Sequence, residues 1–165
     1  MFLSLLALFL LASCAKPDLP DTILRAGTGE ELAACRAELG QRFAADRLAA
    51  LDTALNELQL AGMDRGLATA AARAAAMREQ VNGRTVHAVE ILGWQARRAR
   101  LRGEIGQLTE IRDQQVAVRD RTAATGTPQA VHDRIASAEE VLGKLRRNLE
   151  ETERQLAAWG VPAQP

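Results

Sequence analysis

The feature that most constrains this chain is an apolar repeat in its last third. Apolar residues, with a single threonine among them, recur there in alternating steps of four and three: Val131, Ile135, Ala138, Leu142, Leu145, Leu149, Thr152, Leu156 and Trp159. This spacing places every member on one side of an α-helix, as in a coiled coil. The sequence therefore predicts one amphipathic helix that must bury its stripe against another helix.

The segment directly before this helix is its expected partner. Thr85 is a good N-cap, and no proline interrupts the chain from there until Pro128, which predicts one helix over residues 86–123. At 1.5 Å per residue it would be about 57 Å long. The turn is short, so we expect an antiparallel hairpin, with pairing between subunits as the alternative. The register of such a hairpin would pair Leu108 with Leu145, Ile111 with Leu142, and Trp94 with Trp159.

Glycines interrupt the apolar face of the predicted 86–123 helix. Gly93, Gly103 and Gly106 lie inside it, and each costs about 1 kcal/mol relative to alanine. We expect a kink, or the close approach of another helix, near Gly103 and Gly106.

Shorter helical patterns precede the hairpin. Thr28 and Glu31 have capping-box spacing, Gly40 indicates a bend, and Asn82-Gly83 is typical of a helix end. The predicted short helices span residues 28–39, 44–61 and 67–80. Cys35 falls on the apolar stripe of the first helix, so burial in the core is favoured over an intermolecular disulfide.

The predicted fold class is all-α, with three short N-terminal helices followed by a long antiparallel helical hairpin with coiled-coil-like packing. The N-terminal residues are organised differently. An apolar run from Phe2 to Ala12 is about as long as the apolar part of a signal peptide and too short to span a bilayer. It closes on Leu11-Ala12-Ser13-Cys14, which looks like the lipobox of a bacterial lipoprotein signal.

That pattern predicts cleavage before Cys14 and acylation of its thiol, with palmitate among the acyl chains. The run lacks the Lys or Arg that a signal peptide carries before its apolar part. An uncleaved anchor or a buried apolar strand is the alternative. Resemblance to such lipoproteins implies the outer membrane facing the periplasm, because alanine follows Cys14 where an aspartate would direct the protein to the inner membrane.

Residues 15–27 contain Pro17 and Pro20 and no sustained period, which predicts an extended tether. The short run Thr22-Ile23-Leu24 either packs on the body or stays free. The predicted organisation is a signal peptide, a lipidated cysteine with its tether, a short-helix part, the hairpin and a disordered tail, over residues 1–13, 14–27, 28–83, 84–160 and 161–165.

A wider resemblance covers residues 14–113. It rests on the lipobox, Phe43, Asn82-Gly83-Arg84-Thr85, Val89-Glu90-Ile91, and an arginine-rich helix through Glu104-Ile105 and Leu108. In this order the sequence resembles small bacterial lipoproteins whose domain has no known function. His87 and Ala88 depart from the acidic residues expected after the capping threonine. The resemblance implies a helical lipoprotein and no activity or functional residue.

Composition and motifs argue against several function classes. Lys plus Arg equals Asp plus Glu, 21 against 21, so no bulk charge attracts nucleic acid. Neither His87 nor His132 has the further His, Cys or carboxylate ligands at helical spacing that a metal site needs. The sequence contains no G-x-S-x-G nucleophile motif and no phosphate-binding P-loop. We therefore expect no enzyme, cofactor, metal or nucleic-acid partner.

One charged cluster is the candidate binding site. Arg97, Arg98, Arg100 and Arg102 follow Trp94 closely, and guanidinium groups grip phosphates and carboxylates through paired hydrogen bonds. The competing interpretation is a solvated helix face, because the four arginines spread around the helix at 100° per residue.

The sequence thus predicts a non-catalytic envelope lipoprotein that presents a helical hairpin as a protein-interaction or structural module. Its partners would be the membrane, through acylated Cys14, and another protein or a second copy, through the heptad helix. The alternative function is a ligand-binding or inhibitory periplasmic lipoprotein acting through Arg97–Arg102. A murein-linked spacer is disfavoured, because the chain ends Ala163-Gln164-Pro165 without the lysine used for attachment.

Overall fold

The computed structural model describes residues 17–162, and this part of the chain is helical with no named strand. A short 3-10 turn, η1 (Leu19–Asp21), precedes the helices α1 (Gly29–Arg42), α2 (Ala45–Asp64), α3 (Ala70–Val81), α4 (Val86–Thr122) and α5 (Gln129–Ala158). The predicted all-α class is confirmed.

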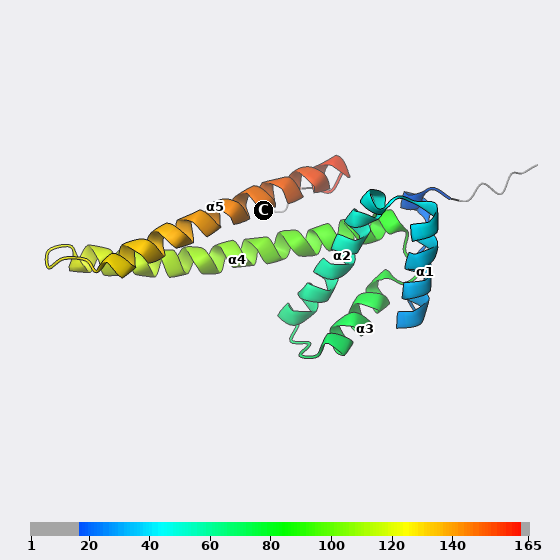
Figure 1. Cartoon of the computed structure of the whole chain (residues 1–165), viewed down its shortest axis with the longest axis horizontal. Helices are drawn as coiled ribbons and strands as arrows, with labels where there is room; N and C mark the ends of the chain where they lie inside the picture. The colour runs from blue at the N-terminus through cyan, green and yellow to red at the C-terminus, as the bar shows by residue number, and fades with distance from the viewer. Residues whose placement is uncertain (1–16, 163–165) are drawn as a thin grey trace, which may run out of the picture.

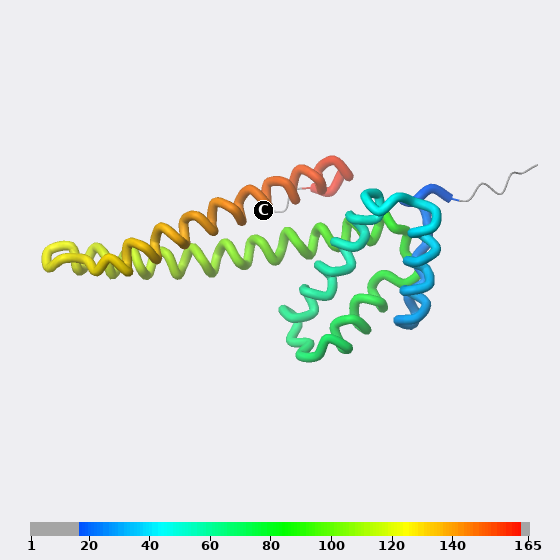
Figure 2. The backbone as a smooth tube through the Cα atoms, in the orientation of Figure 1, coloured from blue at the N-terminus to red at the C-terminus, as the bar shows by residue number. Residues whose placement is uncertain are grey.

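The molecule has a compact end and a thin, elongated end. α1, α2 and α3 gather around the first part of α4, and we call this end the body (Figure 1). α4 and α5 lie side by side, run in opposite directions, and continue far beyond the body to the turn that joins them (Figure 2). The described N-terminal residues lie at the body, far from the turn between α4 and α5 (Figure 1).

Side-chain caps set the helix starts. The Thr28 hydroxyl accepts from the Glu31 amide while the Glu31 carboxylate accepts from the Thr28 amide, which confirms the capping box. The Thr85 hydroxyl caps α4 by accepting from the Ala88 amide. α1 continues through Gly40 to Arg42, so the predicted bend there is wrong.

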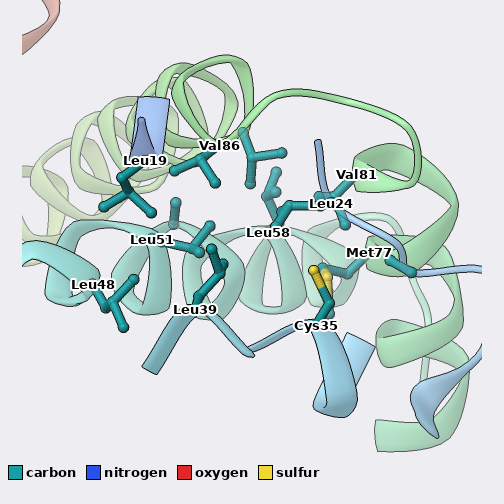
Figure 3. Packing of buried hydrophobic residues seen from close by; sticks show 13 residues of the cluster. Leu19, Leu24, Cys35, Leu39, Leu48, Leu51, Leu58, Met77, Val81 and Val86 are labelled. Carbon is teal, nitrogen blue, oxygen red and sulfur yellow. The ribbon is translucent and has the colours of Figure 1, made fainter. Parts of the chain in front are cut away.

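The core of the body draws on every helix around it. Leu39 of α1, Leu51 of α2, Met77 of α3 and Val89 of α4 are all at most 3 % exposed, and Figure 3 shows several of these side chains converging. Each such burial contributes about 1.5–3 kcal/mol relative to exposure. Cys35 is 3 % exposed among them, which confirms the burial that its stripe predicts.

The close approach between helices is at Gly93, which corrects the prediction for Gly103 and Gly106. A Cβ placed on Gly93 would lie 2.3 Å from the Ala54 Cα, whereas one on Gly103 or Gly106 would meet nothing within 4 Å. α4 runs as one helix past these two glycines. The first glycine therefore lets α2 pack against α4, and the later two have no such role.

α5 buries its stripe on α4. Leu142 and Leu156 are each 1 % exposed, and the rings of Trp94 and Trp159 meet edge to face with centroids 6.0 Å apart. The prediction that these two tryptophans are neighbours is confirmed. Ile111, expected to face Leu142, is instead 52 % exposed.

Residues 17–27 differ from the predicted tether. Their backbone is largely extended, but it is docked on the body: the Leu24 amide donates to the Arg84 carbonyl, and the Val86 amide donates to the Thr22 carbonyl, each at 2.8 Å. Leu24 is 1 % exposed. The burial of Leu24 and the backbone hydrogen bonds explain why this segment packs on the body, which its prolines did not indicate.

Candidate functional site

The predicted lipidation site, Cys14, lies outside the described residues, but the chain that follows it is held on the body from Pro17 onward. Arg42 donates from Nη2 to the Pro17 carbonyl at 2.6 Å. Arg47 pairs with the Asp18 carboxylate at 3.2 Å. Pro17, the first described residue, comes three positions after Cys14 in the sequence.

The four arginines of the predicted cluster lie in the middle of α4 and face different neighbours. Arg100 turns toward α2. Its Nε and Nη2 donate to the two carboxylate oxygens of Glu57 at 2.9 and 2.7 Å, and its Nη1 donates to Glu104 at 2.7 Å. Glu57 is 5 % exposed. These hydrogen bonds, those to Glu57 foremost, raise the pKa of Arg100 above its ordinary value.

Arg98 is buried, at 2 % exposed. Its Nη1 donates to the Pro162 carbonyl at 3.2 Å, and the Val161 amide donates to the Leu156 carbonyl. Arg98 thus holds the chain just after α5. Residues 161 and 162, in the predicted disordered tail, make these two contacts, and residues 163–165 lie outside the described part.

Arg102 and Arg97 have other roles. Arg102 bridges the two long helices by donating to Glu153 of α5 at 2.8 Å. The Arg97 guanidinium lies over the Trp94 ring, 5.3 Å from its centroid. Within the described residues, Arg97 Nε and Trp94 Nε1 are buried without a hydrogen-bond partner.

An aromatic corner forms where the end of α5 meets the start of α4. His87 and Trp94 both pack edge to face against Trp159, with centroid separations of 5.5 and 6.0 Å. His87 Nδ1 also lies 3.9 Å from Glu90. Burial raises the pKa of Glu90, and the nearby His87 opposes that shift. The corner fastens α5 to the body.

The arginine cluster therefore acts mainly inside the molecule. One arginine joins α4 to α2, one holds the residues after α5, and one joins α4 to α5. An anion would have to compete with Glu57, Glu104 and Glu153 for these guanidinium groups. That the four arginines bind an anionic ligand together stays a prediction, and this geometry weighs against it.

The partners of the arginines were missed in the sequence. Glu57 is buried, but at 100° per residue it falls far from the stripe of Leu48, Leu51, Leu55 and Leu58, so the spacing did not indicate its burial. Glu153 carried no signal either, because it is one of several charged residues along α5.

Other site types find no support in the part of the chain that is described. Residues 17–162 contain no group of three His, Cys, Asp or Glu side chains placed to hold a metal ion. None of the helices in this range is both long enough and apolar enough to cross a membrane. Comparison of the sequence with protein-family models, with curated proteins and with solved structures gives no match.

Proposed function

We propose that this chain is a non-catalytic, lipid-anchored protein of the bacterial envelope that presents its α4–α5 hairpin to a protein partner. The observation that carries the proposal is the position of Pro17, the first described residue after the predicted anchor, relative to the hairpin. Pro17, close to Cys14, is held at the body, and α4 leads away from that body to a remote turn.

The docked N-terminal segment supports the proposal because it joins the anchor side to the start of the hairpin. Thr22 and Leu24 pair with the backbone beside Thr85, where α4 begins. The 37 residues of α4 span about 56 Å at 1.5 Å per residue. A body held at a membrane could then place the turn several nanometres away from it.

The finer architecture is part of the proposal. We take the body to be the short-helix part and α4–α5 to be an antiparallel hairpin with coiled-coil-like packing. The Trp94–Trp159 contact and the Arg102–Glu153 ion pair support one register along it. Placement at the outer membrane, facing the periplasm, rests on the lipobox and on the alanine that follows Cys14, by resemblance to bacterial lipoproteins.

The alternative, a ligand-binding or inhibitory protein acting through Arg97–Arg102, has less support. Three of the four guanidinium groups already bind acidic side chains or the Pro162 carbonyl. We therefore place the interaction surface on the hairpin beyond the body.

Two measurements test the proposal. Metabolic labelling with an alkyne palmitate should mark the wild-type chain, and Cys14→Ala should abolish the label while Cys35→Ala, the matched control, keeps it. Photo-crosslinkers should then capture a protein at positions on the distal half of α4 and α5. No label, or capture only at positions on α1 and α3, would contradict the proposal.

A further inference from the structure

A mainly apolar surface lies on one side of the hairpin beyond the body. A shallow hollow of about 240 Å³ separates Leu108 and Ile111 of α4 from Ala138 and Val141 of α5, with Gln115, Ser137 and Arg134 around it. Ile111 is 52 % and Val141 41 % exposed. These seven residues are the distal patch. Large apolar side chains this exposed on neighbouring helices indicate a surface that another molecule covers.

The distal patch differs from the opposite side of the same helices. At 100° per residue, Asp113 of α4 and Glu139, Arg146 and Glu150 of α5 fall on that opposite side, and all four are exposed. The distal patch has one charged member, Arg134. Depletion of charge around apolar side chains is the compositional mark of an interface core.

The charges at the two ends of the patch indicate what covers it. Glu104 lies one heptad before Ile111, and Arg134 lies one heptad before Val141. Because α4 and α5 run in opposite directions, these steps lead opposite ways along the hairpin, each by about 10 Å. A carboxylate thus marks the end of the patch near the body, and a guanidinium marks the end near the turn.

We propose that the distal patch binds the distal patch of a second copy of this chain, with the two hairpins antiparallel. A two-fold axis between Ile111 and Val141 brings each Arg134 level with Glu104 of the other copy. Within residues 17–162 Arg134 has no ion-pair partner, and the Glu104 side chain is 40 % exposed although it accepts from Arg100. The surface is therefore self-complementary in charge, as a closed dimer requires.

This inference deepens the proposed function, since it names the partner of the hairpin. It rests on that proposal only for the hairpin being an interaction surface and not for the acylation of Cys14. Failure of palmitate labelling would leave the dimer standing. Capture of a foreign protein at Ile111 and Val141 would support the interaction module but overturn the dimer.

Crosslinking of the full chain in cells tests the arrangement. Val141→Cys and Ile111→Cys, being next to the axis, should each form a dimer with a short bismaleimide. Gln129→Cys, beside the turn, should not, because antiparallel packing keeps the two turns apart. The parent chain is the background control, since Cys35 is buried. Dimers at Gln129→Cys, or none at Val141→Cys and Ile111→Cys, would overturn the proposal.

An exchange of charges distinguishes specific pairing of the two distal patches from nonspecific hydrophobic association. Arg134→Glu should lower the dimer affinity at least about tenfold, because it places like charges together twice. Combining it with Glu104→Arg should restore crosslinking at Val141→Cys, since the opposite charges meet again. Ile23→Glu introduces the same carboxylate at an exposed apolar residue of the body, 59 % exposed, and should have no effect. A dimer affinity that Arg134→Glu leaves unchanged, or crosslinking that the double exchange does not restore, would contradict this arrangement.

Discussion

At the scale of single residues, Glu90 shows how packing changes the behaviour of a charge. Its side chain is partly buried near the start of α4, and burial raises the pKa of its carboxyl from the ordinary 4.5. His87, 3.9 Å away, opposes the shift. A raised pKa in the folded state means that folding favours the protonated form. That stabilisation is complete below about pH 4.5 and is lost as the pH rises through the folded-state pKa.

Glu90→Gln is therefore expected to stabilise the protein at neutral pH and to change little at acidic pH. The amide has the shape of the protonated acid and carries no charge to desolvate. Thermal unfolding of both proteins between pH 4 and 8 would measure the difference in melting temperature. Glu79→Gln, at an exposed position on α3, is the matched control, and a difference that does not grow with pH would contradict the assignment.

Gly93 and Gly103 are predicted to respond oppositely to the same substitution. Gly93→Ala places a Cβ 2.3 Å from the Ala54 Cα, so we expect a loss of about 3 kcal/mol in the free energy of unfolding. Gly103→Ala meets nothing within 4 Å and should gain about 0.5–1 kcal/mol from helix propensity. Urea denaturation measures both, and equal effects would refute the assignment of the close approach to Gly93.

At the scale of elements, the Glu57–Arg100 pair joins α2 to α4. Glu57 is 5 % exposed and accepts two hydrogen bonds from one guanidinium. Burying such a pair costs desolvation energy, so its net contribution to the free energy of folding is modest. Loss of one member, however, leaves the charge of the other buried without a partner. Because the pair joins one position of α2 to one position of α4, it also favours one register between these two helices.

Removing one member of the Glu57–Arg100 pair should therefore cost more stability than the intact pair contributes. Glu57→Ala is expected to cost about 2–3 kcal/mol in the free energy of unfolding, since Arg100 keeps only Glu104. Asp52→Asn breaks the similar but more exposed pair with Arg36 and should cost under about 1 kcal/mol. Chemical denaturation compares the two variants. A Glu57→Ala loss no larger than the Asp52→Asn loss would mean that burial adds nothing to this pair.

The two long helices were predicted with different success for a physical reason. α5 repeats its apolar residues without a break, so one sequence stripe defines its buried side. α4 instead packs against α2 with one side and against α5 with another, and its apolar positions divide between them: Gly93 faces α2, and Leu101 is buried. A divided pattern predicts that a helix exists but leaves its partners open.

At the scale of the whole molecule, the body and the distal hairpin are expected to be separable in stability. The buried cluster that centres on the body contains no residue of α5. Beyond the body, α4 and α5 depend mainly on each other. Changes in the length of the hairpin should therefore leave the body folded.

Deletion of residues 112–118 together with 135–141 tests this separation. The two segments are opposite each other in the register, so each helix loses a heptad and the remaining stripe stays in phase. We expect the hairpin to shorten by about 10 Å, measured by small-angle X-ray scattering, with the amide-exchange protection of α1–α3 unchanged. Deletion of residues 112–118 alone, the control, should disrupt the pairing. Loss of protection in the body after the paired deletion would contradict the separation.

The sequence alone determined the elements of this protein. The apolar periodicity, the capping threonines, and the glycines and prolines at helix ends are signals that act over a few residues. The helices, the burial of Cys35 and the contact between the two tryptophans could therefore be predicted. Only the tertiary structure decided that residues 17–27 dock on the body, that Gly93 is the close approach, and that the arginines meet Glu57, Pro162 and Glu153. These contacts join segments far apart in the chain, and their energy depends on which helix faces meet, which local spacing does not encode.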